Sequence, residues 1–395
     1  MELDVKRPVW VEINLDNLAH NIKEIKKHIS PKTEIMAVIK ADAYGHRALG
    51  IIDTLREVDI RKFAVAVLSE AIEIRKKYSD IQVMLLGYTP DANLGEVVDM
   101  GITPTIYSIR QAKLLNEIAK SKNKKVTIHI NIDTGMHRVG LPTKYKTVEV
   151  IKEISELEFI YLEGIYTHFA AADDEDKWYT HKQVKEYNYI IDELEKVGVK
   201  IPVKHVSNSA AIIDLPELNY DMVRPGLIIY GHYPAEFQER ERKIDLKPVM
   251  SLHSKIYHIR NLEKGESISY GLTYTVKRES RTGLIPIGYA DGYFRGLSNK
   301  ARVIIKGKNA VAKVAGRVCM DKFVVDITGL DVNGGDEVIL FGSDEFHTVS
   351  TEELANIVDT INYEVLCAIS KRVPRVYKRN NRIVEIIDEV LEGGK

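Results

Sequence analysis

Residues 34–46 read EIMAVIKADAYGH, and the rest of the chain is interpreted outward from this stretch. Residues 34–39 form a short apolar run with β-branched side chains, which is typical of a buried strand. A helix-like segment follows at residues 47–58. The stretch therefore predicts a strand followed by a helix, with Lys40 directly behind the strand.

The same unit recurs as far as Gly231. Strands that alternate with helices pair in parallel through right-handed crossovers, and eight such units predict an N-terminal (β/α)8 TIM-type barrel in an α/β protein. The expected strands lie at residues 34–39, 63–68, 82–86, 103–107, 125–132, 159–167, 202–206 and 220–223, and helix-like segments lie at 47–58, 70–78, 109–121, 144–155 and 182–197.

Beyond Gly231 the alternation of strands and helices stops. The charged stretch at residues 236–243, EFQERERK, suits a surface connection, and we expect a domain boundary near residue 243. Glycine turns and short runs then predict a C-terminal mainly-β domain over residues 244–395, interrupted by a single helix at 351–370. The expected strands are residues 250–259, 281–286, 302–306, 310–314, 323–327 and 337–341.

The first residues carry a separate signal. Residues 9–14 alternate with period two and predict a strand within an N-terminal segment, residues 1–14. We expect this segment to pack with the C-terminal domain. Leu18, Ile22 and Ile25 then repeat at helical spacing behind Asp16, a candidate helix cap. The barrel domain is accordingly expected over residues 15–243.

Composition excludes several classes of protein. The 395 residues carry 56 Lys and Arg against 57 Asp and Glu, so no overall field draws the chain to nucleic acid or to an anionic membrane. Cys319 and Cys367 allow at most one disulfide, and neither has a partner at metal-ligand spacing. No signal sequence and no apolar run of about 18 residues is present. We expect a cytoplasmic protein with no metal, nucleic acid or membrane partner.

Lys40 is the first candidate for chemistry. A lysine behind buried aliphatic residues is partly desolvated, which lowers its pKa and frees the amine as a nucleophile for carbonyl carbon. In a barrel, reactive residues lie on the loops that follow the carboxyl ends of the strands. Lys40, His168 and Arg224 each occupy such a position in the expected order of strands.

Nine collinear motifs resemble those of the alanine racemase family, and the resemblance covers essentially the whole chain. The first, at residues 38–46, is similar to the family's pyridoxal-phosphate lysine motif. The motifs are VIKADAYGH at 38–46, DTGMHRVG at 133–140, YTHFA at 166–170, SNSAA at 207–211, VRPG at 223–226, SYG at 269–271, GYADG at 288–292, CMD at 319–321 and INYE at 361–364.

The resemblance implies a barrel with a C-terminal β domain, a homodimer with its active sites at the subunit interface, and pyridoxal 5'-phosphate as cofactor. Racemisation requires a Cα proton to be removed from one face and returned on the other. The resemblance assigns Lys40 to one face and Tyr270 of the partner subunit to the opposite face. The implied activity is interconversion of L-alanine and D-alanine, which supplies D-alanine for peptidoglycan.

Two further residues are implied around Tyr270 and the cofactor. An unperturbed tyrosine has a pKa near 10, so nearby positive charge is needed to favour its phenolate. The resemblance places Tyr270 against His168, and His168 against Arg224. Arg224 is also expected to face the ring nitrogen of the cofactor, where a guanidinium, having no acceptor, leaves that nitrogen unprotonated. The resulting weak electron sink suppresses transamination.

The resemblance also names the groups that hold phosphate and substrate. The phosphate is expected on Tyr44, Ser209 and Tyr363 with backbone amides near Asn208, Gly226 and Leu227. Arg138 and the backbone of Met320 are expected to hold the substrate carboxylate, and Tyr289 and Tyr363 to narrow the entrance to the size of a methyl side chain.

Asn131 departs from the family pattern. Many members have a carbamylated lysine there that orients the arginine corresponding to Arg138. Asn131 cannot supply that negative charge, and a bound anion is the hypothesis that compensates for it.

Four alternatives are weighed against this interpretation of the sequence. A racemase of the same fold could act on serine, lysine or another amino acid. A non-catalytic pyridoxal-phosphate carrier typically lacks the β domain and the equivalent of Tyr270. Related barrel decarboxylases and a cofactor-free aldolase are disfavoured by Arg224, since the former are expected to carry a carboxylate there and the latter needs neither Arg224 nor a phosphate site.

Overall fold

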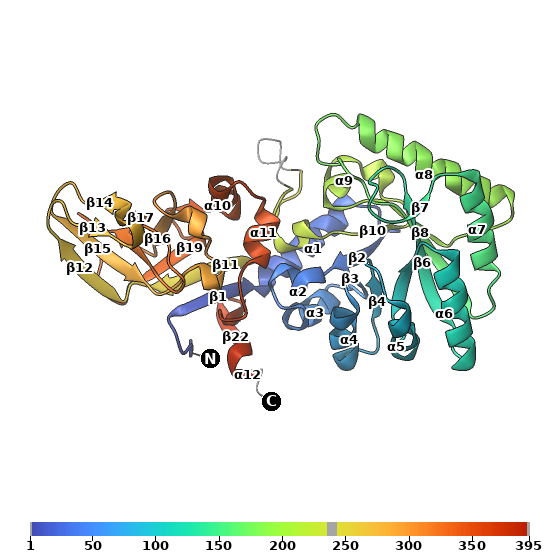
Figure 1. Ribbon diagram of the computed structural model, residues 1–395, viewed down its shortest axis with the longest axis horizontal. Helices are drawn as coiled ribbons and strands as arrows, with labels where there is room; N and C mark the ends of the chain where they lie inside the picture. The colour runs from blue at the N-terminus through green and yellow to red at the C-terminus, as the bar shows by residue number, and fades with distance from the viewer. Residues whose placement is uncertain (1, 235–242, 393–395) are drawn as a thin grey trace.

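A computed structural model describes residues 2–234 and 243–392 of the chain, and Figure 1 shows two lobes joined end to end. The lobe on the right is the barrel, and the lobe on the left is built mainly from strands. Residues 236–242, most of the charged connection expected from the sequence, lie outside the described residues. No helix in the described ranges combines the length and apolar character that crossing a bilayer requires.

The barrel lobe alternates strands with helices, as expected from the apolar runs. Its strands are β2 (Glu34–Val38), β3 (Lys62–Val65), β4 (Gln82–Leu85), β5 (Thr103–Ile106), β6 (Val126–Asp133), β7 (Leu141–Pro142), β8 (Ile160–Tyr166), β9 (Val203–His205) and β10 (Met222–Val223). Its helices are α1 (Leu15–His28), α2 (Lys40–Tyr44), α3 (Ala48–Glu57), α4 (Leu68–Lys77), α5 (Leu94–Met100), α6 (Ile109–Ser121), α7 (Tyr145–Ser155), α8 (Trp178–Lys196) and α9 (Ser209–Asp214), with 3-10 turns η1 (Asp91–Asn93), η2 (Pro216–Leu218) and η3 (Leu227–Tyr230).

Parallel pairing closes the barrel. The order is β2-β3-β4-β5-β6-β8-β9, and β10 pairs with β2 through Val223 and Ile35, while β7 adds to β6. Between β9 and β10, the Arg224 amide donates to the Ser207 carbonyl at 3.0 Å. The predicted eight-strand barrel is confirmed for the described residues. All its main strands therefore end at one mouth, where Lys40 and Arg224 lie.

The second lobe is a mainly antiparallel sheet, which confirms the predicted mainly-β domain. Its strands are β1 (Val9–Asn14), β11 (Met250–Lys255), β12 (His258–Leu262), β13 (Ser267–Ile268), β14 (Tyr274–Thr275), β15 (Ser280–Ile285), β16 (Arg302–Ile305), β17 (Ala310–Val314), β18 (Phe323–Asp326), β19 (Glu337–Ser343), β20 (Thr348–Val349), β21 (Arg375–Arg379) and β22 (Arg382–Ile387), with η5 (Tyr270–Leu272), η6 (Tyr289–Asp291), η7 (Arg295–Leu297), α10 (Thr351–Val358), α11 (Asn362–Cys367) and α12 (Glu389–Glu392).

Strand β1 belongs to this sheet although it opens the chain. The sheet runs β12-β15-β18-β17-β16-β19-β11-β1-β21-β22 along its main path. Glu12 of β1 stands opposite Ser251 of β11 in an antiparallel pair and opposite Val376 of β21 in a parallel pair. This pairing is consistent with the expected packing of residues 1–14 against the C-terminal domain.

The two lobes meet where α11 lies beside α2, near the centre of Figure 1. The buried Arg375 guanidinium donates to the Gly45 carbonyl at 3.2 Å, and the Tyr377 hydroxyl donates to the His46 carbonyl at 3.0 Å. Gly45 has a φ of 83°, and a Cβ there would lie 2.5 Å from the Leu366 carbonyl oxygen. This close approach fixes α11 against the turn that follows Lys40.

Three local expectations from the sequence are wrong. The single helix expected at 351–370 is divided into α10 and α11, because Asp359 adopts a left-handed conformation with φ of 59°. The run at 250–259 is divided into β11 and β12. Helix α1 is capped by Asn14, whose side chain accepts from the Asn17 amide at 3.0 Å, and not by Asp16, whose carboxylate accepts from the Asn380 amide.

Candidate active site

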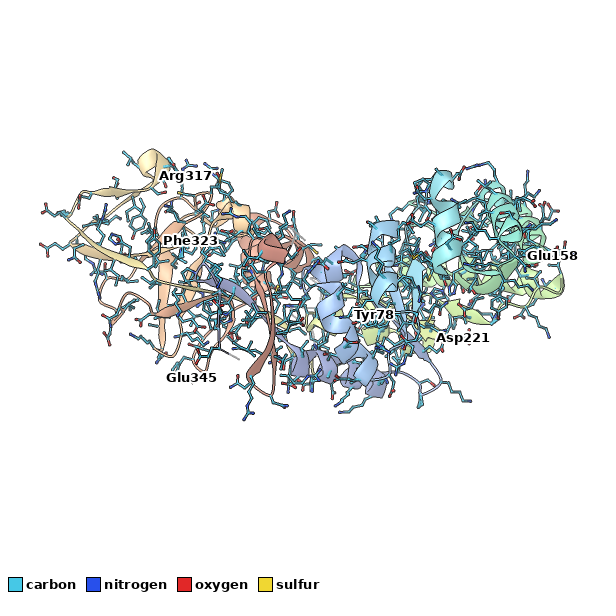
Figure 2. All side chains as sticks on the ribbon, turned by 90° about the horizontal axis from the view of Figure 1, so that it is seen from below. Tyr78, Glu158, Asp221, Arg317, Phe323 and Glu345 are labelled. Carbon is cyan, nitrogen blue, oxygen red and sulfur yellow. The ribbon has the colours of Figure 1, made fainter. Side chains whose placement is uncertain are left out.

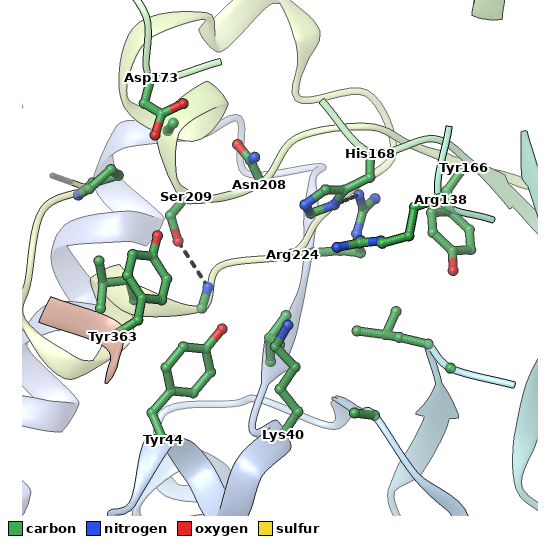
Figure 3. Close-up of a pocket in the computed structure, with 18 of the residues that line it drawn as sticks. Lys40, Tyr44, Arg138, Tyr166, His168, Asp173, Asn208, Ser209, Arg224 and Tyr363 are labelled. Carbon is green, nitrogen blue, oxygen red and sulfur yellow. Dashed lines mark hydrogen bonds between the residues drawn. The ribbon is translucent and has the colours of Figure 1, made fainter. Parts of the chain in front are cut away.

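A cavity of about 390 Å³ opens at the carboxyl end of the barrel strands. Figure 3 shows Lys40 and Tyr44 entering it from one side and Arg138, His168 and Arg224 from the other. The lining includes all ten of the residues expected from the sequence to bind cofactor, namely Lys40, Tyr44, Arg138, His168, Asn208, Ser209, Arg224, Gly226, Leu227 and Tyr363. The cavity thus brings together side chains from the mouth of the barrel and Tyr363 of α11 in the second lobe.

Lys40 is held at the cavity by an unusual turn. The four residues that follow it, 41–44, have φ between 51° and 55°, which makes one left-handed turn. Each such residue costs roughly 1–2 kcal/mol, so the surrounding contacts must impose the turn. Asp42 supplies two of them, because its carboxylate accepts from the Ala48 amide at 2.9 Å and its amide donates to Glu70 at 3.2 Å.

The environment of Lys40 favours its neutral amine. Partial burial, with a smaller contribution from the Arg138 charge, lowers the pKa of Lys40 below its usual range. Both causes disfavour the ammonium form. The expected desolvation of this lysine is therefore present in the structure.

Hydroxyl groups and a backbone amide gather on the other side of the cavity. The Gly226 amide donates to Ser209 Oγ at 3.0 Å, the dashed line in Figure 3. A Cβ on Gly226 would lie 2.7 Å from the Tyr44 hydroxyl, so only glycine leaves room there. The rings of Tyr44 and Tyr363 lie 6.0 Å apart, and the side chain of Asn208 caps α9 by accepting from the Ala211 amide.

The two tyrosines are hydrogen-bond donors at neutral pH. Burial raises the pKa of Tyr44 well above its usual range and, with the Asp173 charge nearby, raises the pKa of Tyr363 to about 12. Protonated phenols with the Ser209 hydroxyl and nearby amides form a donor set that suits an anion such as a phosphate group.

Arg224 is held by a set of acceptors. It is 3% exposed, and its guanidinium donates to the carbonyl of Thr167 at 2.7 Å and to the carbonyl and Nδ1 of His205 at 2.9 and 2.8 Å. It also lies 4.9 Å over the Tyr166 ring. Burial lowers the pKa of Arg224 to about 10, so the group keeps its charge at neutral pH.

His168 lies next to Arg224, as expected. Arg224 Nη2 approaches His168 Nδ1 at 3.4 Å, and a guanidinium can only donate, so this nitrogen of His168 is the acceptor. Burial and the charges of Arg224, Arg138 and Lys40 lower the pKa of His168 to about 3. His168 is therefore neutral, with its proton on Nε2.

Arg138 differs from Arg224 because it is exposed and has no hydrogen-bond or ion-pair partner within residues 2–234 and 243–392. Asn131 lines the same cavity and carries no charge, as the sequence indicates. Together with Arg224, Arg138 gives the cavity a cationic lining against the single carboxylate of Asp173. Such a lining favours anionic ligands.

These features fit pyridoxal 5'-phosphate. The cofactor requires an amine for its aldehyde, donors for its phosphate and a group facing its ring nitrogen. Lys40 offers the amine, Tyr44, Ser209 and the Gly226 region offer the donors, and Arg224 is a fixed charge in the same cavity. The space kept clear by Gly226 beside Tyr44 allows the close approach that a phosphate needs.

The remaining expected residues lie elsewhere. Tyr270, Tyr289 and Met320 line a separate, open hollow on the C-terminal lobe, and none of them lines the Lys40 cavity. Tyr270 is 76% exposed. Its neighbour Ser269 donates to the carbonyl of Arg317, and Figure 2 labels Arg317 at the end of the molecule away from the barrel. A single chain therefore does not bring Tyr270 to Lys40.

The turn that carries Tyr289 is held in place by buried contacts. Asp291, which ends the turn that starts at Tyr289, is fully buried; its carboxylate accepts from the Gly288 amide at 3.0 Å and pairs with Arg7 at 2.6 Å. This interaction gives the aspartate of the GYADG motif a structural role. The motif presents Tyr289 on the surface.

The sequence did not single out His205 or His129, which lie behind Arg224. His129 Nδ1 is 2.8 Å from His205 Nε2. The only signal in the sequence is that each histidine lies within a run that predicts a barrel strand. A histidine within a predicted strand does not indicate which residue it meets across a barrel.

The comparisons with known proteins agree over both lobes. The profile described as "Alanine racemase, N-terminal domain" matches residues 13–234, and that described as "Alanine racemase, C-terminal domain" matches residues 249–377. The alanine racemase of Clostridium tetani is 47% identical over 381 residues, covering 96% of this chain and 98% of the relative.

Solved structures agree as well. That of alanine racemase from Clostridium difficile 630 has a TM-score of 0.92 at 46% identity, covering 98% of this chain and 99% of that chain. A structure of alanine racemase from Bartonella henselae, described with covalently bound pyridoxal phosphate, has a TM-score of 0.83 at 28% identity, covering 94% of this chain and 99% of that chain.

Proposed function

The chain belongs to the alanine racemase family, and from this premise we propose how its residues divide the reaction between two copies of the chain. The protein is an isomerase that interconverts L-alanine and D-alanine. The observation that carries the proposal is the separation of the Lys40 cavity from the exposed Tyr270. The biological role proposed for the product D-alanine is peptidoglycan synthesis.

We propose pyridoxal 5'-phosphate as the resident cofactor. When bound, it supplies an electron sink for negative charge at the substrate Cα. Lys40 would hold it covalently, and Arg224 would face its ring nitrogen. The phosphate would be held by the donor set of Tyr44, Asn208, Ser209, Gly226, Leu227 and Tyr363, all of which line the cavity.

Lys40 and Tyr270 are proposed as the two bases. Lys40 Nζ, whose pKa is lowered by burial, takes or returns the Cα proton on one face of the substrate. The Tyr270 hydroxyl of the second copy acts on the opposite face. His168, neutral and protonated on Nε2, has a donor available for the phenolate oxygen of that tyrosine, and the charge of Arg224 behind it favours the phenolate.

The substrate carboxylate is assigned to Arg138 and to the backbone of Met320 from the second copy. Arg138 suits this role because its guanidinium has no partner in the described part of the chain. Tyr363 of one copy and Tyr289 of the other would narrow the entrance and favour a methyl side chain. Asn131 leaves Arg138 without the carbamate charge of many relatives, and the anion hypothesis for that position stands as a proposal.

The first test is formation of D-alanine from L-alanine by the purified protein with pyridoxal phosphate, with L-serine and L-lysine assayed in parallel. Rapid conversion of alanine and slow conversion of the others is the expected result. Faster conversion of serine or lysine would contradict the assignment of the tyrosine entrance.

Mixing two inactive variants tests the shared site directly. In a mixed dimer of Lys40→Ala and Tyr270→Phe chains, one of the two sites receives an intact Lys40 from one chain and an intact Tyr270 from the other. We expect the mixture, after subunit exchange, to recover about a quarter of wild-type activity, since half of the dimers of a symmetric pair are mixed and half of their sites are intact. No recovery with proven exchange would place both bases in one chain.

A further inference from the structure

A line of buried polar side chains runs from Arg224 through the interior of the barrel. Arg224 Nη1 is 2.8 Å from His205 Nδ1, His205 Nε2 is 2.8 Å from His129 Nδ1, and His129 Nε2 is 2.9 Å from Glu163 Oε2. The two histidines are at most 1% exposed. The line joins the residue that follows β10 to β9, β6 and β8, and it ends at Glu163, whose carboxylate also accepts from Gln82, the first residue of β4.

The two ends of this line, a guanidinium that only donates and a carboxylate that accepts, require the same direction for its hydrogen bonds. A guanidinium has donors only, so His205 Nδ1 must be an unprotonated acceptor. The neutral ring then carries its proton on Nε2 and donates to His129 Nδ1. By the same argument His129 is protonated on Nε2 and donates to Glu163. The line therefore has one consistent arrangement of protons, with a cation at one end and a carboxylate at the other.

The charges along the line are consistent with this arrangement. Burial lowers the pKa of both His205 and His129, which keeps both rings neutral. The hydrogen bond from His129, together with that from Gln82, lowers the pKa of Glu163 to about 2 despite its partial burial. Lys62, the first residue of β3, adds a favourable charge near Glu163. Glu163 is therefore ionised at neutral pH.

The backbone is shaped to admit the line. A Cβ on Gly164 would lie 2.4 Å from the His129 ring, so β8 leaves space for this imidazole only because residue 164 is glycine. The pairing of β6 with β8 shifts register between Ile128 and His129. On the other side, the Tyr166 ring stacks on His205 at 4.8 Å and lies under Arg224. Strand geometry, a glycine and an aromatic ring together hold both imidazoles in place.

We propose that His129 and Glu163 are positioning residues of the racemase: they fix His205 with a bare Nδ1, and this acceptor holds Arg224 in place. The inference rests on the proposed role of Arg224 at the cofactor ring nitrogen. Without Glu163, His129 loses the acceptor that selects its tautomer, and His205 can then carry its proton on Nδ1. A protonated Nδ1 opposes the Arg224 donor, so the guanidinium is no longer held where it limits transamination.

The first experiment reads the tautomers by nitrogen NMR of the holoenzyme labelled at histidine, with the two signals assigned by their absence in His129→Phe and His205→Phe. Both rings are expected to be neutral and protonated on Nε2. In Glu163→Leu the Nε2-protonated form of His205 is expected to be lost or mixed, whereas Glu163→Gln, which keeps an acceptor oxygen, retains it. A wild-type His205 protonated on Nδ1, or an imidazolium at either position, would overturn the proposal.

The second experiment measures pyruvate released per D-alanine formed, because transamination leaves the amino group of alanine on the cofactor and releases the carbon skeleton as pyruvate. Glu163→Leu is expected to raise this ratio several-fold, and Glu163→Gln to leave it near the wild-type value. The matched control is Glu34→Gln, which removes a carboxylate that pairs with Lys62 but makes no contact with the histidines. An unchanged ratio in Glu163→Leu would overturn the proposal.

Two further variants separate the possible failures. If Glu163→Leu does not fold, His129→Phe keeps a ring in the space beside Gly164 while removing both nitrogens, and the same rise in the ratio is expected. Arg224→Glu tests the proposed role of Arg224 itself. If the ratio of pyruvate to D-alanine rises in Arg224→Glu but is unchanged in Glu163→Leu and His129→Phe, only the roles of His129 and Glu163 are overturned. An unchanged ratio in Arg224→Glu overturns the proposed role of Arg224 and, with it, the function assigned to the line behind it.

Discussion

The Lys40 cavity and the surface around Tyr270 differ in how completely a single chain builds them. In the cavity, Arg224 is buried and held by several acceptors, and His168, Ser209 and Gly226 have defined partners. Around Tyr270 the anchoring is confined to the backbone turns and to residues such as Ser269, while the tyrosine itself is 76% exposed. One region has the donors and charges that fit a cofactor, and the other presents a tyrosine that no residue in the described part of the chain covers.

This difference indicates which part of the proposed reaction, proton transfer by Tyr270, depends on association of two chains. Large aromatic and apolar side chains exposed together, here Tyr270, Leu272 and Met320, mark surfaces that contact another protein. In the proposed dimer, a second copy of the chain offers the complementary cavity. Changes in the cavity should therefore affect cofactor and reaction together, whereas changes at Tyr270 should affect proton transfer alone.

Lys40→Ala should have the largest effect. Removal of the amine eliminates the covalent link and one base together, so racemisation should fall by roughly 10⁴-fold or more, the scale seen when a reacting group is lost. The measurements are D-alanine formation and retention of the cofactor absorbance after gel filtration. Covalently retained cofactor in this variant would show that another lysine holds it.

Tyr270→Phe should reduce proton transfer and leave cofactor binding unchanged. Loss of the hydroxyl should reduce racemisation by about 10²- to 10⁴-fold, the usual contribution of a general acid or base. The cofactor absorbance should remain that of the wild type, because Tyr270 does not line the Lys40 cavity within its own chain. A fully active variant would remove Tyr270 from the mechanism.

Arg224→Glu should change the products of the reaction more than it changes the affinity of the protein for the cofactor. The carboxylate would favour a protonated ring nitrogen and a stronger sink, so racemisation should fall by about 10²-fold while pyruvate formation rises. The expected readout is a higher ratio of pyruvate to D-alanine with the cofactor still bound. Arg224→Lys is the control that keeps the positive charge while losing the planar set of donors.

Glu337→Gln should have the smallest effect on activity, because it lies in neither region. Burial opposes ionisation of Glu337, but hydrogen bonds from His253 and Lys306 outweigh it and lower the pKa of Glu337 to about 2. Since the folded-state pKa lies below the ordinary value of 4.5, the carboxylate stabilises the fold above about pH 4.5 and this contribution is lost as the pH falls toward 2.

At pH 7 the Glu337→Gln variant should lose about 2 kcal/mol of the free energy of unfolding, with D-alanine formation unchanged under native conditions. Urea denaturation of both proteins between pH 7 and pH 2.5 is the measurement. The difference between the two proteins should shrink as the pH falls. A difference that is constant with pH would mean that the charge of Glu337 is not what stabilises the fold.

The sequence predicted the positions of the site residues well, because barrel geometry converts their places in the chain into places in space. Lys40, His168 and Arg224 each follow a strand, and parallel strands deliver such residues to one mouth. The sequence could not predict the left-handed turn at residues 41–44, since local propensity disfavours it and distant contacts such as Glu70 to Asp42 impose it. Nor did the sequence predict the break at Asp359, where one left-handed residue ends α10.

The spacing of apolar residues and the sequence motifs by themselves determined three features: the order of barrel and β domain, the lysine at the end of the first barrel strand, and the family to which the chain belongs. These features are local, and they can be recognised from residue types and spacing. Only the tertiary structure decided that β1 pairs with both β11 and β21, and that His205, His129 and Glu163 meet behind Arg224. Each of these depends on which strands become neighbours, and pairing across a closed barrel is set by the packing of the whole chain.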